Sequence, residues 1–496
     1  MNIFSILSIL FCSFVTLTFA VDSPLWVQGA FENATTSDAT YNTGGTITVN
    51  GFTMNVPKNL LVQFPAAWVP YKDFVESKDD FLGFETQVIG NRLDGIPHVA
   101  QIIIYEFFEG ESMGWIQSIN YTDGSMKIQD GPTIRINDPN GVFSVGYDGA
   151  PFLTADDVSP SITSFSGFPM CIPRNTTDPL CPLTNRPTSG PGIFVAPDQY
   201  VMAPFQPGDF ITFSGFRRGD EVIAFTIVAE NVQIRTVGDL VYVRMVLGLL
   251  GVNSNDPVTE IAQSRFIGFV SNPDASLTLY AMDVDPCTGD VTRRLIASSG
   301  LKGGVNNQHK WEYRADILFG YTREYYVEAE INGVAKKFPT KNGLMAGTYV
   351  QPINVWIPAE QEVPGVPPPN YDFSQMAFLT EGVGLDDQGR LWGPLDPFPQ
   401  SGLNLNTPVC QPSANPAHGR ARRATGGRWM TVDRGEARAD AENKNLEDPA
   451  DLVVAPAEVE AIKAHEKAKA EKEVTFSKGS TPMMRRKRSH SQGRKW

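Results

Sequence analysis

The feature that most restricts the fold is a two-residue alternation of apolar and polar side chains, which recurs between Val21 and Pro412. Such alternation places one side of a segment in a core and the other in water, as in a β-strand. The alternating segments are short and end at Gly-containing turns, whereas helical periodicity is scarce. We therefore expect a mainly β protein with two or three antiparallel β-barrel or β-sandwich domains, and not a doubly wound sheet.

Dipeptides that favour tight turns locate several hairpins. Asn50-Gly51 separates two alternating segments, and its tolerance of positive φ at both positions suits a type I′ turn. Two Asp-Gly dipeptides divide residues 115–136 into a predicted three-stranded meander. From Asp209 to Arg235, the strand lengths resemble a small closed or partly closed barrel of the OB type. The hairpins share no fixed period, so we expect no clear internal repeat.

Composition divides the chain into five expected parts. They are a signal peptide (1–20), one or more N-terminal β domains with the OB-like barrel segment (21–245), a β-sandwich-like domain (246–362), a proline linker with an irregular packed segment (363–412) and a disordered charged tail (413–496). The linker VPGVPPPN is stiff. The residues after it are rich in Phe, Leu and Trp, which predicts that they pack back onto the body.

The first twenty residues predict export. An apolar run from Ile3 to Phe19 ends in Thr18-Phe19-Ala20, a small-x-small cleavage pattern, although no Lys or Arg precedes it. The alternative, an uncleaved anchor, is weaker because a span needs about 20 apolar residues. The best later apolar run, 245–252, is too short to span. We expect an extracellular protein with no membrane span after signal removal.

Cysteine usage fits an oxidising compartment. Apart from one Cys in the signal, the chain has Cys171, Cys181, Cys287 and Cys410, which allow three disulfide pairings. A local Cys171–Cys181 bridge is the economical choice, and a Cys287–Cys410 bridge would then restrict the unfolded chain by roughly 4 kcal/mol. The body has no CxxC and only two histidines, so we expect neither a metal site nor a cofactor.

Two kinds of modification site are predicted. Asn-x-Thr sequons at Asn33, Asn120 and Asn175 are glycosylation acceptors on a secretory route, and each is also compatible with chance. Asn120 is the doubtful one because it lies in a predicted strand. A dibasic site at Arg422 and Arg423 suits a secretory kexin-type protease, because exposed disordered chain is readily cut.

Charge is unevenly distributed along the chain. The formal net charge is −14, but residues 420–496 carry +6 and the preceding residues −20. The basic clusters at 420–423 and 485–488 allow a nucleic-acid role, proteolytic processing, or neither, in which case they belong to a solvated charged tail or to an artefact of gene prediction. Because an acidic body repels phosphate and the signal peptide sends the chain outward, we expect no nucleic-acid partner.

The chain lacks the catalytic motifs HExxH, GxxxxGK[ST] and GxGxxG, and its single match to GxSxG is the string GESMG at 110–114. A Ser-His-Asp hydrolase would need His98 or His309 as its base. Carboxylate groups that suit a glycosidase are Glu106/Glu109/Glu111, Asp156/Asp157, Asp283/Asp285/Asp290 and Asp386/Asp387. Solvated turn carboxylates are the ordinary alternative, so the catalytic residues are unknown.

Two further patterns bear on ligands. Residues 283–294 superficially suggest calcium, but Cys at position 5 and Arg at position 12 exclude an EF-hand, which leaves a looser calcium turn or a plain hairpin. Tryptophan on a β face beside carboxylates suits sugar rings, and core packing is its ordinary fate. The candidates are Trp26, Trp68, Trp115, Trp311, Trp356 and Trp392.

Four longer strings carry a resemblance. They are GTITVNGFTMNVPKNLLVQFPAAWVPYKDF from Gly45, SFSGFPMCIPR from Ser164, LYAMDVDPCTGD from Leu279 and TKNGLMAGTYVQPINVWI from Thr340. Between about Gly45 and Gln400 the chain resembles an uncharacterised group of predicted secreted proteins of filamentous fungi. The resemblance implies an extracellular fungal setting and transfers no activity or catalytic residue.

The sequence thus favours a secreted, glycosylated, disulfide-stabilised β-rich protein. We expect it to act by binding or as a cell-surface or matrix component, with extracellular polysaccharide or a wall component as its partner. The alternative is an extracellular carboxylate-dependent glycan hydrolase. A cleft with two carboxylates roughly 5–10 Å apart would favour hydrolysis, whereas an aromatic platform without them would favour binding.

Overall fold

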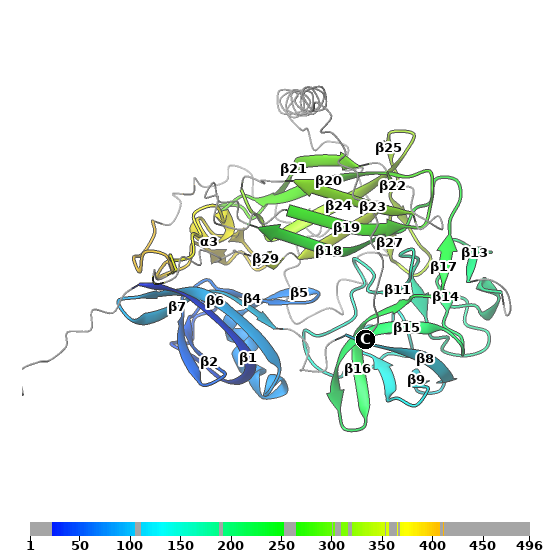
Figure 1. Cartoon of the computed structure of the whole chain (residues 1–496), viewed down its shortest axis with the longest axis horizontal. Helices are drawn as coiled ribbons and strands as arrows, with labels where there is room; N and C mark the ends of the chain where they lie inside the picture. The colour runs from blue at the N-terminus through cyan, green and yellow to red at the C-terminus, as the bar shows by residue number, and fades with distance from the viewer. Residues whose placement is uncertain are drawn as a thin grey trace, which may run out of the picture. The chain divides into compact units, whose positions relative to one another are not determined.

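The computed structural model in Figure 1 describes residues 22–104, 111–187, 192–251, 264–299, 301–302, 309–315, 320–352, 354–356, 365, 368–406 and 410. These residues belong to one contact unit and are mainly β, as the alternation predicts. The predicted signal peptide, the site at Arg422 and Arg423 and the charged tail lie outside the described residues. Within the described part, no helix has both the length and the apolarity to cross a membrane.

Five strands near the N-terminus form a closed circuit, here called the first barrel. Its strands are β1 (Ser23–Thr36), β2 (Gly45–Val49), β3 (Phe52–Val56), β6 (Glu85–Leu93) and β7 (Ile96–Ile104). The pairings run β1–β2–β3–β7–β6 and back to β1, and only the β3–β7 pair is parallel. Between β3 and β6 lie β4 (Leu61–Phe64), β5 (Ala67–Pro70), α2 (Tyr71–Glu76) and η1 (Lys78–Phe81).

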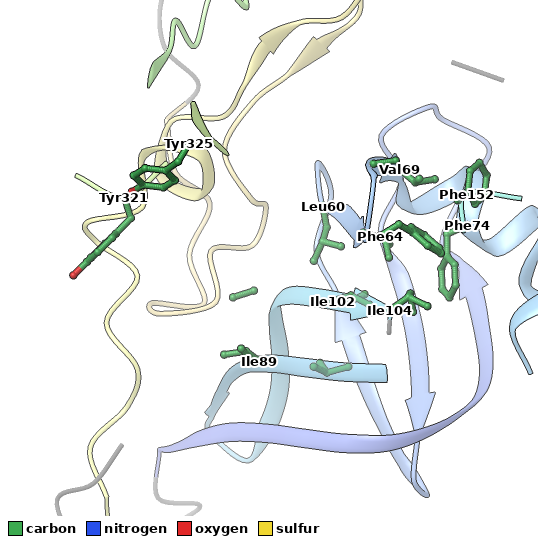
Figure 2. Close-up of a cluster of buried hydrophobic side chains, with 14 of the residues drawn as sticks. Leu60, Phe64, Val69, Phe74, Ile89, Ile102, Ile104, Phe152, Tyr321 and Tyr325 are labelled. Carbon is green, nitrogen blue, oxygen red and sulfur yellow. The ribbon is translucent and has the colours of Figure 1, made fainter. Parts of the chain in front are cut away.

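Local sequence explains how this barrel forms. Asn50 and Gly51 have φ of 48° and 77°, which confirms the predicted turn between β2 and β3. Inward side chains and the α2–η1 region share one apolar core. Figure 2 shows Phe64, Phe74 and Phe152 of this core clustered together, with ring centroids 6.3 Å apart for Phe64–Phe74 and 5.4 Å for Phe64–Phe152. Fully buried rings of this kind each stabilise the fold by about 1.5–3 kcal/mol.

A second closed circuit of five strands, the second barrel, follows in the chain. Its strands are β8 (Glu111–Asn120), β9 (Ser125–Ile128), β10 (Thr133–Ile136), β15 (Phe210–Arg218) and β16 (Glu221–Ala229). The pairings run β8–β9–β10–β16–β15 and back to β8, with β10–β16 parallel. The predicted meander and the OB-like segment are therefore parts of one five-stranded barrel.

The two barrels repeat one strand circuit although the sequence shows no period. In each, the first strand pairs with the fourth in its N-terminal half and with the second in its C-terminal half. In each, the fifth strand also pairs in parallel with an extra strand, β4 in the first barrel and β11 (Ile162–Ser164) in the second. Turn positions and inward apolar residues reproduce the circuit without sequence identity.

The parallel pair that closes each barrel, here called its seam, differs in length. The seam of the first barrel is the single residue pair Asn55–His98. The seam of the second barrel has four residue pairs, between residues 133–136 and 221–224. Arg135 reinforces it, because its Nε and Nη2 donate to both carboxylate oxygens of Glu221 at 3.0 and 2.8 Å.

Two further sheets face each other after the barrels. One has the order β22–β23–β19–β18–β29, and in the other β24 pairs with β20, β25 and β28, while β21 pairs with β20. Phe266 and Tyr325 come from opposite sheets and their ring centroids lie 5.2 Å apart. The strands are β18 (Val243–Gly251), β19 (Ser264–Val270), β20 (Ser276–Val284), β21 (Val291–Ser299), β22 (Leu301–Lys302), β23 (Lys310–Ala315), β24 (Glu324–Ile331), β25 (Val334–Ala335), β28 (Thr348–Pro352) and β29 (Asn354–Trp356).

Shorter elements complete the described part. They are β12 (Met170–Cys171), η2 (Leu183–Asn185), β13 (Ile193–Val195), β14 (Ala203–Pro204), β17 (Gln233–Arg235), β26 (Phe338–Pro339), β27 (Met345–Ala346), α3 (Ala377–Thr380), β30 (Gly384–Leu385) and β31 (Leu391–Trp392). Disulfides join Cys171 to Cys181 and Cys287 to Cys410, which are the pairs that loop economy favours.

Residues 368–406, here called the C-terminal segment, pack back onto the body as predicted. Buried Asn91 of the first barrel donates to the Tyr371 carbonyl at 3.0 Å and accepts from the Tyr371 N–H at 2.9 Å. The Lys58 and Asp396 backbones also bond to each other. The C-terminal segment therefore covers part of the first barrel and satisfies polar groups there.

Candidate functional site

A pair of aromatic residues, one exposed and one half-buried, lies on the outside of the second barrel, where β8 runs beside β15 (Figure 1). Trp115 of β8 and Phe210 of β15 are directly opposite in register, with ring centroids 5.0 Å apart and planes inclined by 57°. Trp115 is 48% exposed, and Met113, two residues earlier on the same side of β8, is 65% exposed. We call Met113, Trp115 and Phe210 the aromatic surface.

The local sequence directs these side chains outward. Ile116 is 2% exposed and Ile211 is fully buried, so the neighbours of Trp115 and Phe210 along each strand fill the barrel interior. Because successive side chains on a strand alternate between faces, Trp115 and Phe210 must point away from the core. Large apolar side chains that gather on the solvent face of a barrel indicate an interaction site.

Two exposed amide side chains lie beside the rings. Asn231 accepts from the Phe210 N–H at 2.9 Å and donates to the Gly208 carbonyl at 3.2 Å. These bonds hold its amide in place and leave one N–H and one lone pair for a ligand. Exposed Gln129 is next to Trp115, since its N–H donates to the Trp115 carbonyl at 2.9 Å. Flat apolar rings beside fixed amides can contact the apolar face and the hydroxyls of a sugar.

The other tryptophans divide into core and surface residues. Trp68, Trp311 and Trp392 are 4%, 1% and 0% exposed, so they pack in the interior, which is the ordinary fate of this residue. Trp26 is 46% exposed on β1 of the first barrel. The side chain of Trp356 lies outside the described part of the structure.

Both body histidines are partly or fully buried. His98 of β7 is half-buried, and burial lowers its pKa. His309 is 5% exposed, and burial together with the nearby Arg235 cation lowers its pKa. Neither ring nitrogen of His309 has a hydrogen-bond partner among the described residues. A buried imidazole without an orienting carboxylate lacks the arrangement of a catalytic base.

Except for exposed Asp387, the carboxylates proposed for hydrolysis serve turns and ion pairs where the structure describes their side chains. Asp156 accepts from the N–H groups of Val158 and Ser159, and Asp157 accepts from the Asn140 amide. Asp283 accepts from Arg294 at 2.7 and 3.1 Å. Glu106 and Glu109 lie outside the described residues, as does the side chain of Glu111.

Asp386 is the most buried of these candidates. Burial alone would raise its pKa, but hydrogen bonds from Trp392 Nε1 and from Arg390 outweigh burial and keep the pKa below its usual range. Arg390 Nε donates at 2.7 Å and Trp392 Nε1 at 3.1 Å. Its neighbour Asp387 is exposed. Asp386 therefore holds the β30–β31 turn as an ionised acceptor.

The suspected calcium turn is a hydrogen-bonded hairpin end. Asp285 accepts from the N–H groups of Cys287 and Thr288 at 2.8 and 2.7 Å, and Asp290 accepts from the Thr288 hydroxyl at 2.8 Å. Among the described residues, no cluster of three or more His, Cys, Asp or Glu has the arrangement of a metal site.

A small buried cavity lies where the first barrel, the start of β24 and the C-terminal segment meet. Its lining includes Trp68, Gln101 and Arg323, and the Arg323 guanidinium lies 5.3 Å from the Trp68 ring centroid. Trp68 Nε1 and Gln101 Oε1 have no hydrogen-bond partner among the described residues. At about 20 Å³ the cavity has room for one water molecule and not for a sugar ring.

An acid beside this cavity has an unusual pKa. Glu324 is fully buried, and burial raises its pKa to about 7 although the adjacent Arg323 cation acts in the opposite direction. Its Oε1 has no hydrogen-bond partner in the described structure. Burial at the start of β24 therefore favours the neutral form of Glu324.

All three sequon asparagines are exposed. Asn33 lies on β1, where its Oδ1 accepts from Lys78 Nζ at 2.8 Å. Asn120 is the last residue of β8, so the doubtful sequon lies at a strand end. Asn175 lies in the loop closed by Cys171–Cys181, and its Oδ1 accepts from the N–H and the hydroxyl of Thr177, both at 2.9 Å. Each position is open to a modifying enzyme.

The sequence identified Trp115 as a candidate but missed its companions Met113, Phe210, Asn231 and Gln129. The alternation along β8 could have identified Met113, because Met113 lies on the same side of the strand as Trp115. Phe210 of β15 and Asn231 of the turn after β16 come about 95 to 115 residues later, and alternation does not say which strands are neighbours.

Comparison with known proteins does not assign a function to this chain. No protein-family model matches the chain, and a search of the curated proteins finds no match.

Proposed function

We propose that this protein binds a neutral polysaccharide outside the cell through the aromatic surface, as a cell-surface or matrix component. One observation carries the proposal: an exposed Trp115 lies against Phe210 on the solvent face of a closed barrel. Because the interior of the barrel is filled, the ring pair is not needed for the core. Its apolar area is available to a ligand.

The charge of the body selects the class of polysaccharide. Residues before 420 carry a net charge of −20, so an anionic glycan would be repelled at long range. Ring stacking and amide hydrogen bonds need no ligand charge. A neutral chain of hexoses therefore fits the aromatic surface better than a uronic-acid polymer or a nucleic acid.

Binding is better supported than hydrolysis. Most of the described carboxylates that were candidates for acid and base are engaged in turns and ion pairs, as Asp386 with Arg390 and Asp283 with Arg294 illustrate. The aromatic surface, in contrast, has no structural task within the barrel. We therefore place the function in recognition rather than in bond cleavage.

Depletion of the purified full chain by insoluble β-glucan, chitin and mannan tests the proposal, with an acidic polysaccharide as the negative comparison. We expect at least one neutral polymer to bind, and Trp115→Ala to weaken binding about tenfold or more. Tyr200→Ala is the matched control, because Tyr200 is an exposed aromatic residue outside the aromatic surface. Equal binding by Trp115→Ala and the wild type would contradict the proposal.

The extracellular setting is a separate part of the proposal, supported by the two disulfides. Intact and reduced mass spectrometry of protein recovered from culture medium tests it. We expect loss of the first twenty residues, a mass increase of about four hydrogens on reduction, and glycan mass on one or more sequons. A cytosolic chain with four free thiols would contradict export.

A further inference from the structure

We propose that the equivalent face of the first barrel, centred on Trp26, is a second subsite for the same neutral polysaccharide, so that the chain binds bivalently. This inference rests on the proposed function of the aromatic surface. It starts from the repeated circuit, in which the first strand of each barrel pairs with the fourth. In the first barrel the fourth-strand residues Ile89 and Asn91 on this side are buried, so β1 provides the exposed tryptophan and glutamine of the face.

The strand register allows the two faces to be compared one cross-strand residue pair at a time, and we call each outward-facing pair a row. In the first barrel, Ala30 is the last β1 residue paired with β6, before β1 turns to pair with β2. In the second barrel, Trp115 is the last β8 residue paired with β15, before β8 turns to pair with β9. The row that begins with Ala30 therefore corresponds to the row that begins with Trp115.

Counting outward rows from this point places Trp26 on the corresponding face. Gln28 corresponds to Met113, and Trp26 lies two rows before Ala30, about 13 Å along the strand. Leu25 and Val27 are 3% and 5% exposed, which confirms that Trp26 between them points outward. The first strand of each barrel thus carries one exposed tryptophan, near the middle of the paired region in the first barrel and at its end in the second.

The surroundings of Trp26 have the chemistry of a sugar subsite. Gln28 is exposed on the same side of β1 and lies directly opposite Gln87 of β6. Gln28 Nε2 donates to Glu85 Oε1, which fixes one side of its amide and leaves the second N–H and the carbonyl lone pairs for hydroxyl groups. A sugar ring stacked on Trp26 would lie about 7 Å along the strand from the amide group of Gln28.

Charge again favours a neutral ligand. The carboxylate nearest to Gln28 on this face is Glu85, and the body as a whole is acidic, so an anionic chain is repelled here as at the aromatic surface. Two subsites for one polymer raise the effective affinity because the second contact forms at high local concentration. A repeating polysaccharide can occupy both faces, whereas a short oligosaccharide occupies one at a time.

Four variants of the full chain test the inference: Trp26→Ala, Trp115→Ala, the double variant and the control Tyr200→Ala. Depletion by the polymer that binds the wild type measures avidity, and titration with a short oligosaccharide of the same sugar measures stoichiometry. We expect each single variant to lose about tenfold in polymer affinity. The oligosaccharide stoichiometry falls from two to one in each single variant and to zero in the double variant.

The outcomes separate the two proposals. If Trp26→Ala binds like the wild type while Trp115→Ala fails, the second subsite is wrong and the proposed function stands. If neither variant changes binding, or if the wild type binds no polymer, both proposals fail. Sizing chromatography tests whether a second copy of the chain, and not a sugar, binds the Trp26 face. A change of oligomeric state in Trp26→Ala without a change in sugar stoichiometry would assign this face to self-association and overturn the inference. Circular dichroism shows whether each variant is folded, and Trp26→Gln, which removes the ring but keeps a longer side chain, keeps the test decisive if Trp26→Ala unfolds.

Discussion

The two barrels share a strand circuit but differ in how firmly it is closed. Four residue pairs and the Arg135–Glu221 ion pair form the seam of the second barrel, whereas the seam of the first is the Asn55–His98 pair alone. The first barrel has instead the C-terminal segment against it, bonded at Asn91 and Lys58. The comparison teaches that turns and inward residues determine the strand circuit. Its closure can be reinforced either by contacts at the seam itself or by a segment that is distant in the sequence.

Loss of the long-range disulfide is expected to have the largest effect on this comparison. Cys287–Cys410 closes a loop with a sequence separation of 123 and tethers the C-terminal segment. The double variant Cys287→Ser/Cys410→Ser should lower the free energy of unfolding by about 4–5 kcal/mol on the loop-entropy model. Urea denaturation measures the loss, and hydrogen exchange should increase mainly in β6 and β7.

The local disulfide gives a control for that experiment. Cys171–Cys181 has a sequence separation of 10, so Cys171→Ser/Cys181→Ser should cost about 3 kcal/mol and affect the second barrel. An equal increase of exchange in both barrels after loss of Cys287–Cys410 would contradict the view that distant chain supports the first barrel in particular.

Inward and outward aromatic residues of the second barrel should behave differently. Phe213 of β15 is 3% exposed, and Phe213→Ala should destabilise the protein by about 3–5 kcal/mol through a cavity. Trp115→Ala should change stability by less than about 0.5 kcal/mol, because an exposed side chain loses little packing. Thermal and urea unfolding of the two variants make the measurement, and a large destabilisation by Trp115→Ala would assign Trp115 a structural task.

The junction beside the first barrel should respond to pH. Glu324 has an unfolded-state pKa near 4.5 and a folded-state pKa of about 7, because burial favours its neutral form. Stability from this group is complete below pH 4.5 and is lost as the pH rises through 7. Relative to Glu324→Gln, which mimics the neutral acid, the wild type should lose about 3 kcal/mol across this range.

Denaturation at several pH values, with wild type and Glu324→Gln in parallel, tests this expectation. A difference between the two that does not change between pH 4.5 and 8 would show that Glu324 is not buried as described. Hydrogen exchange localises the effect: it should increase in β5 and β7, which contribute Trp68 and Gln101 to the cavity lining, and not in β8 and β9.

Loss of the ion pair at the seam of the second barrel should have a modest effect. Arg135→Gln removes the two charge-assisted bonds to Glu221, and both groups are partly exposed, so the cost should be about 1 kcal/mol. We expect faster exchange in β10 and the first half of β16, as the second seam comes to resemble the first. Lys127→Gln on the neighbouring strand is the control, and faster exchange in both variants alike would contradict a specific role for Arg135.

Much of the fold is predictable because alternation and turn residues act locally. The Asn50-Gly51 hairpin, the meander after Trp115 and the return of the C-terminal segment follow from residues a few positions apart. The closure of each barrel does not, since nothing near Asn55 shows that it will meet His98, or near Thr133 that it will meet Glu221. These contacts form only when the whole circuit is in place, and so the repeated circuit was missed.

The candidate site shows the same division. Alternation places Trp115 and Met113 on one side of β8, but whether that side faces a core or water depends on what the other strands cover. Trp68 and Trp392 have sequence surroundings as apolar as that of Trp115. Both are buried in one cluster, to which the C-terminal segment contributes Val383 and Trp392 itself. Single-sequence reasoning could name the tryptophans as candidates and could not sort them.

The Cys287–Cys410 bond has a practical consequence for anyone who prepares this protein. A single backbone cut at any point between these two residues leaves both products covalently joined, so a nicked molecule keeps its full mass under non-reducing conditions. Gels run without a reductant will therefore conceal proteolysis across residues 287–410, and a reduced lane beside each sample is needed to detect it.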